Sequence, residues 1–260
     1  MSQLYFTSAR FKSYIPDWIT VILLIYIFFQ VVEHWEPFHR QFYINDPRIL
    51  HPFATQQRVT DDQLYVYSTL IPSVIIIITS LFIAPTNVDK LHLIQLSLLG
   101  LLFSVSSVSV LTDILKCWIG NPRPDFIARC GPKPQTPLDM LVDIGVCTSP
   151  LGDMYLSDGL KSTPSGHSSM AFGGLLYLSL WYIGQLQVLT REKHRMGLLL
   201  VSGLPIVFAA YIALSRTQDY RHHFFDIAFG SLLGIVFAWF SHWKYFGKLT
   251  SSQSDGVDTI

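Results

Sequence analysis

The stretch SRTQDYRHHFFD, residues 215–226, crowds ionisable side chains between two apolar runs. His222 and Asp226 are four residues apart, so in a helix they would lie on one face. If Asp226 accepts the N–H of one imidazole nitrogen, the lone pair of the other nitrogen is free, and such a histidine is a nucleophile. His223 lies three residues from Asp226, which is also a helix-face spacing. The spacing therefore favours His222 only slightly over His223.

Three cations accompany the histidines. Lys116 and Arg123 lie in KCWIGNPRP, residues 116–124, and Arg216 lies near the start of the histidine stretch. Converging cations repel metal ions and attract anions, which argues against a metal site built from the two histidines and the aspartate. Arginine binds phosphate through a planar fork, whereas lysine acts as a point charge. The cations therefore predict a phosphate ligand.

The stretch PSGHSS, residues 164–169, adds a helix start to the predicted site. Backbone N–H groups of Ser165, Gly166 and His167 would face a bound anion there, because a helix N-terminus attracts negative charge. Gly166 lets the backbone approach the ligand closely. A bound phosphate would favour protonated His167, which could protonate the leaving alkoxide and later activate water. The cations would stabilise charge on the equatorial oxygens of the phosphoryl group.

The composition indicates the environment in which these residues work. Of 260 residues, 50% are hydrophobic and only 14% are charged, and the mean hydropathy is +0.37. Soluble domains usually carry about 25% charged residues, so the deficit indicates a membrane protein. The formal net charge is zero, which gives no electrostatic support for nucleic-acid binding.

Long windows without charged residues predict six transmembrane helices, since a span needs about 20 mostly apolar residues. They predict an all-α fold, a single six-helix transmembrane bundle over residues 1–260, with a polar and disordered tail at 250–260. The predicted helices cover approximately residues 17–35, 65–85, 91–118, 166–189, 196–216 and 223–243.

The alternation of six spans brings the three stretches to one membrane face. The third helix ends near Lys116, the fourth begins near His167, the fifth ends at Arg216 and the sixth begins near His222. Each stretch alone has an ordinary explanation, as juxtamembrane cations, a helix cap or a structural ion pair. Together they predict an active site at one membrane–water boundary, where ionisable residues are functional candidates.

Three segments resemble the signature of the type 2 phosphatidic acid phosphatase superfamily. These are K-x6-RP at residues 116–124, PSGH at 164–167 and SR-x5-H-x3-D at 215–226. The resemblance covers all three segments in order. It implies a phosphohistidine mechanism that uses no metal ion and no other cofactor.

The resemblance also implies a role for each residue of the signature. His222, rather than His223, is the nucleophile, Asp226 is its partner and His167 is the acid. The residues implied to contact phosphate are Lys116, Arg123, Ser165, Gly166 and Arg216.

Two loop segments resemble the integral membrane lipid phosphate phosphatases, and one of them the fungal diacylglycerol pyrophosphate phosphatases. PFHRQFYINDPRILHPF at 37–53 follows the first predicted helix, and GNPRPDFIARC at 120–130 extends the first motif. The resemblance implies an enzyme that removes phosphate from phosphatidic acid, lysophosphatidic acid or diacylglycerol pyrophosphate. It implies a multi-pass protein of an endomembrane or the plasma membrane, with the active site facing the lumen or the cell exterior.

Two classes of alternative remain open. The chain could hydrolyse sphingoid phosphates, sugar phosphates or polyprenyl diphosphates, or it could be an anion transporter or an inactive phospholipid-binding scaffold. A transporter would place its charges near the bilayer midplane within broken helices, whereas these charges lie at predicted helix ends. A scaffold need not keep His167, His222 and Asp226, and all three are present. We therefore expect a lipid phosphate substrate and the bilayer as partners, and no nucleic acid.

The chain has three cysteines, so at most one disulfide can form within it. Cys117 ends the third predicted helix, where a buried free thiol is the ordinary expectation. Cys130 and Cys147 lie in one long loop that the predicted topology places in an oxidising compartment, where disulfides persist. Closing this loop is worth about 3 kcal/mol in the chain-entropy model. We predict a Cys130–Cys147 bridge, against the alternative of two free or unrelated thiols.

Overall fold

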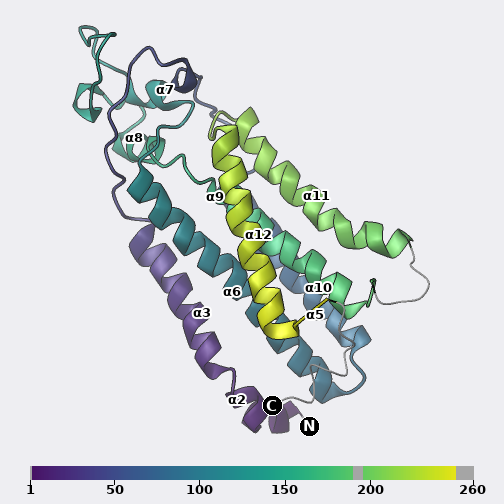
Figure 1. The fold of residues 1–260 in the computed structure, drawn as a ribbon. Coiled ribbons are helices and arrows are strands. Elements are labelled where there is room, and N and C mark those ends of the chain that lie inside the picture. Colours follow the sequence, from purple (N-terminus) through teal and green to yellow (C-terminus); the bar gives the residue numbers. More distant parts are fainter. Residues whose placement is uncertain (1, 190–195, 250–260) are drawn as a thin grey trace.

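The structure of the chain, a computed structural model, describes residues 2–189 and 196–249. These residues form helices joined by loops, without an extended strand. Long helices run side by side through most of the molecule, long loops with short helices lie at one end, and the N-terminus lies at the other (Figure 1). The predicted all-α fold is confirmed, while the predicted tail at 250–260 lies outside the described residues.

Within the described residues, five helices are long and apolar enough to cross a membrane, and the chain is a multi-pass membrane protein. Two of them contain a π-helical segment, a form that is frequent at functional sites. A short helix, α1 (Ser2–Thr7), precedes them. The elements of the five are α2 (Ala9–Lys12), α3 (Ile15–Ile27) and η1 (Phe28–Val32), then α4 (Asp61–Tyr65), η3 (Val66–Leu70) and α5 (Ile71–Ile83), then α6 (Asn87–Ile119), α11 (Met196–Gln218) and α12 (Phe224–Phe246).

A further helical segment, Gly166–Gln185, lies inside the bundle against α6, α11 and α12. It consists of α9 (Gly166–Ala171), the π-helical η5 (Phe172–Leu176) and α10 (Tyr177–Gln185). Its serines, glycines and one histidine make it less apolar than the other five, and length and composition alone do not identify it as a span. The predicted helix continued to residue 189, but residues 186–189 form a turn.

The start of this segment packs against α12 backbone to backbone. A Cβ atom added at Gly230 would collide with the carbonyl oxygen of Ser165, and one added at Gly234 would collide with that of Ser169. Small residues at such positions let helix backbones approach closely. The two glycines therefore seat α9, which carries His167, directly on the helix that carries Asp226.

We expect Gly230→Ala to destabilise the protein, because the added methyl group must displace the backbone of Ser165. Overpacking of this kind costs about 1–3 kcal/mol. Gly203→Ala in α11 is the matched control, since a Cβ atom there would meet no atom within 4 Å and alanine favours a helix. Thermal unfolding in detergent should show a lower melting temperature for Gly230→Ala and an unchanged or higher one for Gly203→Ala. Equal melting temperatures would contradict the tight contact.

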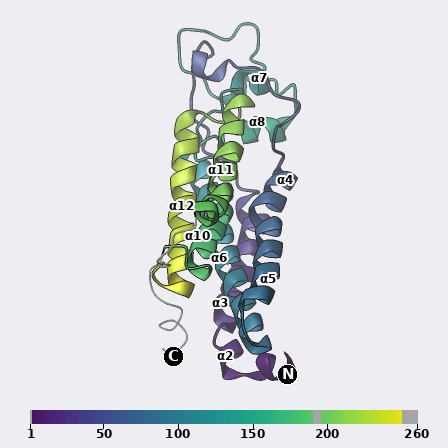
Figure 2. The ribbon, with the colours of Figure 1, turned by 90° about the vertical axis from the view of Figure 1, so that its right-hand side faces the viewer.

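Residues 33–60 and 120–164 form a cap over one end of the bundle (Figure 2). The cap has a small apolar core of its own, contributed by both segments. A disulfide joins Cys130 to Cys147 beside this core, and Cys117 is free and buried. The short helices of the cap are η2 (Pro47–Ile49), α7 (Phe126–Cys130), η4 (Ile144–Val146) and α8 (Asp153–Gly159).

Candidate active site

Residues from the three predicted stretches meet where the bundle reaches the cap. Lys116 lies in the last turn of α6 and Arg216 in the last turn of α11, while Asp226 lies in the first turn of α12. Ser165 is the N-cap of α9. The ammonium group of Lys116 lies against the backbone of Gly166, because a Cβ atom added there would be 2.9 Å from Nζ. Helices distant in sequence thus bring the predicted residues together.

His222 is buried and held by one backbone hydrogen bond. Its Nδ1 lies 2.7 Å from the carbonyl oxygen of Ser162, and because a carbonyl only accepts, Nδ1 carries the hydrogen. The lone pair of Nε2 is therefore free. Burial lowers the pKa of His222 well below its usual value, and the positive charges of Arg123, Arg216 and Lys116 lower it further. A neutral imidazole beside cations can attack a bound phosphate.

The sequence predicted that Asp226 accepts a hydrogen bond from His222, and the structure does not show this bond. Oδ2 of Asp226 lies 3.9 Å from Nδ1 of His222, which is too long for a hydrogen bond. The carboxylate accepts instead from Oγ of Ser162 at 2.6 Å, from the hydroxyl of Thr163 and from the backbone N–H of His223 at 2.8 Å. The reason is local, because Asp226 turns back to cap α12 in a capping box. Asp226 therefore reaches His222 through Ser162.

His223 has both ring nitrogens engaged. Its Nδ1 lies 3.1 Å from Oδ2 of Asp226, and its Nε2 lies 3.1 Å from the carbonyl oxygen of Arg48. Both partners only accept, so both nitrogens carry hydrogen. The hydrogen bond to Asp226 accordingly raises the pKa of His223. A histidine without a free lone pair is not a nucleophile, so the geometry favours His222.

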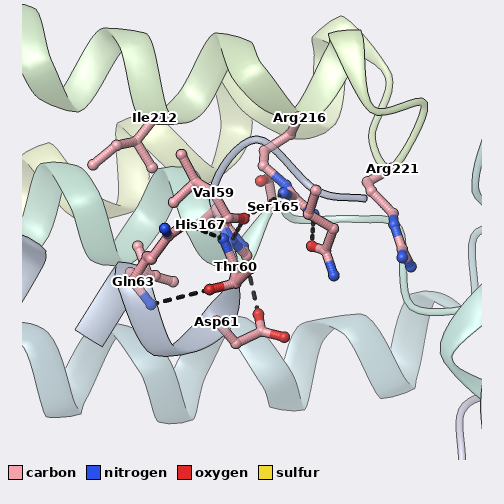
Figure 3. A network of polar contacts seen from close by, with 12 residues as sticks. Val59, Thr60, Asp61, Gln63, Ser165, His167, Ile212, Arg216 and Arg221 are labelled. Atoms are coloured by element: carbon pink, nitrogen blue, oxygen red, sulfur yellow. Dashed lines mark hydrogen bonds and ion pairs between the residues drawn. The ribbon is translucent and has the colours of Figure 1, made fainter. Parts of the chain in front are cut away.

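His167 and Arg216 share one acceptor, the carbonyl oxygen of Val59 (Figure 3). Nε2 of His167 lies 3.0 Å from this oxygen and Nη1 of Arg216 lies 2.9 Å from it. Nε2 therefore carries hydrogen, and Nδ1 of His167 remains available to transfer a proton. The carboxylate of Asp61 lies 3.8 Å from that Nδ1. Arg216 also donates from Nη2 to Oε1 of Gln57 at 2.9 Å.

The N–H of Ser165 is already engaged, contrary to the prediction that it faces a bound anion. It donates to the backbone oxygen of Asp226 at 3.0 Å. The Ser165 side chain caps α9 by accepting from the N–H of Ser168. Gly166 and His167 remain as the predicted donors, since N–H groups in the first turn have no intrahelical acceptor.

Asp158 was not predicted as a site residue, yet it gathers three arginines. It accepts from Nη2 of Arg123 at 2.6 Å and from Nη1 of Arg129 at 2.8 Å, and it lies 3.7 Å from Nη1 of Arg221. Burial opposes its charge, but Arg123, Arg129, Lys116 and Arg221 hold the pKa of Asp158 well below its usual value. Asp158 therefore positions Arg123, one of the predicted phosphate ligands.

One part of this network had a signal in the sequence. Arg129 donates from Nε and Nη2 to both carboxylate oxygens of Asp125 at 2.8 and 2.9 Å, and both side chains are fully buried. Asp125 and Arg129 are four residues apart in the sequence, a spacing that favours an ion pair on one face of a helix. Asp158 lies 29 residues from Arg129, and no spacing marks it.

The donor set at this site suits an anion better than a cation. In the described part of the chain, no group of three or more His, Cys, Asp or Glu side chains could hold a metal ion. Lys116, Arg123 and Arg216 add positive charge around the histidines, and like charges repel.

Comparison with known families identifies one match. Residues 97–249 match the family model of the PAP2 superfamily. The matched range contains all three motif stretches. No solved structure matches the chain.

Several curated proteins are similar over most of the chain. Diacylglycerol pyrophosphate phosphatase 1 of Saccharomyces cerevisiae is 46% identical over 241 residues, which cover 90% of this chain and 80% of that protein. Probable diacylglycerol pyrophosphate phosphatase 1 of Schizosaccharomyces pombe is 37% identical, with coverage of 90% and 81%. Lipid phosphate phosphatase 2 of Arabidopsis thaliana is 33% identical, with coverage of 92% and 79%.

Proposed function

This chain belongs to the PAP2 superfamily and is a lipid phosphate phosphatase, and from that premise we propose that it works through a phosphohistidine on His222 without a metal ion. The proposed substrates are phosphatidic acid, lysophosphatidic acid and diacylglycerol pyrophosphate, the last of which is named in the two fungal relatives. The observation that supports the mechanism is the free Nε2 lone pair of a neutral His222 beside Lys116, Arg123 and Arg216.

In the first step, the Nε2 lone pair of His222 attacks phosphorus and forms a P–N bond. The bond from phosphorus to the lipid oxygen breaks, and protonated His167 gives its Nδ1 proton to that oxygen. The hydrogen bond to Val59 holds the His167 ring in place. The residues that would stabilise the charge on the equatorial oxygens are Lys116, Arg123 and Arg216.

In the second step, His167 acts as a base. Its Nδ1 takes a proton from a water molecule as the water oxygen attacks phosphorus. The P–N bond breaks, its electron pair returns to Nε2 of His222, and inorganic phosphate leaves. The enzyme then has a neutral nucleophile and a protonated acid again.

We propose that Gly166–Gln185 is a sixth span and that the site lies at the membrane boundary on the lumenal or extracellular side. The cap contributes part of the site and contains the disulfide between Cys130 and Cys147. Disulfides persist in oxidising compartments, which supports this orientation of the cap.

An apolar cavity supports a substrate with an acyl chain. It has a volume of about 400 Å³ and is lined by residues of α3, α4, α5, α6 and α9 and of the π-helical segments η1 and η3. Its lining includes Met170, one helical turn after His167, and Tyr65, one turn after Asp61. A lipid whose phosphate occupies the site could therefore place a chain in the cavity.

We expect phosphate release from phosphatidic acid in detergent micelles to continue in excess chelator without added magnesium. Vanadate should inhibit it, because vanadate mimics pentacoordinate phosphorus. Assays of lysophosphatidic acid, diacylglycerol pyrophosphate, a sphingoid phosphate and a polyprenyl diphosphate should show preference for the glycerolipids. Loss of activity in chelator, restored by magnesium, would contradict the mechanism. Preference for a sphingoid or polyprenyl substrate would favour that alternative.

A further inference from the structure

Two arginines each have a buried guanidinium nitrogen with no hydrogen-bond partner in the described chain. These atoms are Nε of Arg216 and Nε of Arg221. An unpaired buried donor is costly, and in native proteins it usually marks an unseen partner or a functional role. Arg216 belongs to the PAP2 signature, but Arg221 does not, although it directly precedes His222 in the chain.

Arg221 is fixed in position without being satisfied. Its side chain is about as buried as that of Arg123, and its guanidinium lies over the ring of Phe53, 4.7 Å from the ring centre. A cation–ring contact of this kind uses no hydrogen-bond acceptor, so the N–H groups of the guanidinium remain available to donate. Its Nη1 lies 3.7 Å from the carboxylate of Asp158, too long for a hydrogen bond.

The carboxylate near Arg221 is occupied by other arginines. Arg123 and Arg129 take the two oxygens of Asp158 at 2.6 and 2.8 Å. Arg129 is also paired with Asp125, so it needs no further partner. Three arginines, counting Arg221, thus share the two carboxylates of Asp125 and Asp158, and the charge of one arginine is left over. Burial, followed by the charges of Arg123 and Arg129, lowers the pKa of Arg221, although Asp125 and Asp158 oppose this shift. Such a buried cation is completed by an anion.

We propose that Arg221 is a further phosphate ligand, which binds a non-bridging oxygen of the phosphoryl group that is transferred to His222. This inference rests on the proposed function. Its basis is that the unpaired Nε of Arg221, in the link between α11 and α12, matches the unpaired Nε of Arg216, five residues earlier in the last turn of α11. Phe53 is the positioning residue, because its ring packs against the guanidinium.

The side of the site on which Arg221 lies decides which oxygen it binds. In Figure 3, Arg221 lies beyond Arg216 as seen from His167. The leaving oxygen must lie at His167, which protonates it, so Arg221 is directed to the transferred group rather than to the leaving group. The benefit of Arg221 should therefore be similar for a lipid monophosphate and a lipid diphosphate, and it should extend to vanadate.

The test compares Arg221→Met with Arg48→Met, a change at an arginine whose side chain is 78% exposed. Arg221→Met should weaken vanadate inhibition and lower kcat/KM for phosphatidic acid and diacylglycerol pyrophosphate alike, each by about 10- to 100-fold, the size expected for a lost charged hydrogen bond. Arg221→Lys should restore part of the loss, because it restores the charge without the fork. Arg48→Met should leave both quantities unchanged.

Two results would overturn the inference. One is an inhibition constant of vanadate for Arg221→Met that lies within about two-fold of the wild-type value, whatever happens to kcat. A merely structural role would leave the affinity for the anion unchanged. The other is a loss confined to the diphosphate substrate. If Arg221→Met does not fold, Phe53→Leu decides the question, because it should weaken vanadate inhibition several-fold without removing a charge. Absence of vanadate inhibition in the wild type would instead contradict the proposed function.

Discussion

His222→Ala should abolish phosphate release from phosphatidic acid, with a fall in kcat of about a thousand-fold or more, the size expected when a nucleophile is lost. Alanine removes the Nε2 lone pair, and no neighbouring group can replace it, because both nitrogens of His223 carry hydrogen. The pKa of His222 is lowered, so its protonation should not limit the wild-type rate near neutral pH. The rate is measured in micelles on protein that remains folded by size-exclusion chromatography and thermal unfolding.

His223→Gln is the matched control for this prediction. It alters the adjacent histidine, which faces Asp226 and the backbone of Arg48, and it should retain activity within about ten-fold of wild type. Rapid quenching with labelled substrate should trap phosphate on the wild-type protein and on His223→Gln but not on His222→Ala. Near-normal activity of His222→Ala would exclude His222 as the nucleophile.

Asp226→Asn should lower kcat by about a hundred-fold or more, in the manner of other carboxylates that hold a catalytic histidine in place. The carboxylate is buried and accepts from two hydroxyl groups and from the backbone and ring of His223. An amide has only one acceptor oxygen, so the donors on one side of the carboxylate, at the least the hydroxyl of Thr163, face an NH2 group instead of an acceptor. The neutral side chain also leaves the charge of His223 without its counter-ion.

Ser162→Ala separates the two ways in which Asp226 could act. It removes the hydroxyl that binds Asp226 but keeps the backbone carbonyl that binds His222. If Asp226 acts by fixing the whole loop, Ser162→Ala should cost much less than Asp226→Asn, about ten-fold at most for one lost hydrogen bond. Wild-type kcat in Asp226→Asn would show that the carboxylate has no part in catalysis.

The sequence predicted which side chains gather at the site because the chemistry fixes their type and spacing. Lys116, Arg123, His167 and Arg216 could be named from cations, histidines and helix ends alone, whereas the choice of His222 over His223 needed the resemblance to the superfamily. Their immediate hydrogen-bond partners could not, because many of these are backbone carbonyls. A carbonyl has no signature in the sequence, since every residue has one.

The partner of His222 shows the limit of an argument from spacing. The four-residue separation from Asp226 is correct for one face of a helix, but α12 begins at Phe224, after His222. His222 therefore lies outside the helix, and its N–H reaches Ser162 of the cap instead. Helix ends decide such contacts, and they are the least predictable part of a pattern.

The segment Gly166–Gln185 shows a second limit. Its centre is predictable from a window without charges, but its packing depends on glycines that meet neighbouring backbones, such as Gly174 against the carbonyl of Ser68. Glycine and serine reduce hydropathy while they allow close approach of helices. A helix that is buried by other helices can therefore be less apolar than those that face lipid.

Val59 couples the stability of the apolar core to the geometry of the active site. Its side chain is 1% exposed and belongs to the apolar core of the bundle, while its oxygen binds both His167 and Arg216. No side-chain substitution removes that oxygen, but any substitution that loosens the core there also moves it. Adaptation of this protein to heat or to a different bilayer, if it passes through position 59, would therefore retune the enzyme's turnover in the same mutational step.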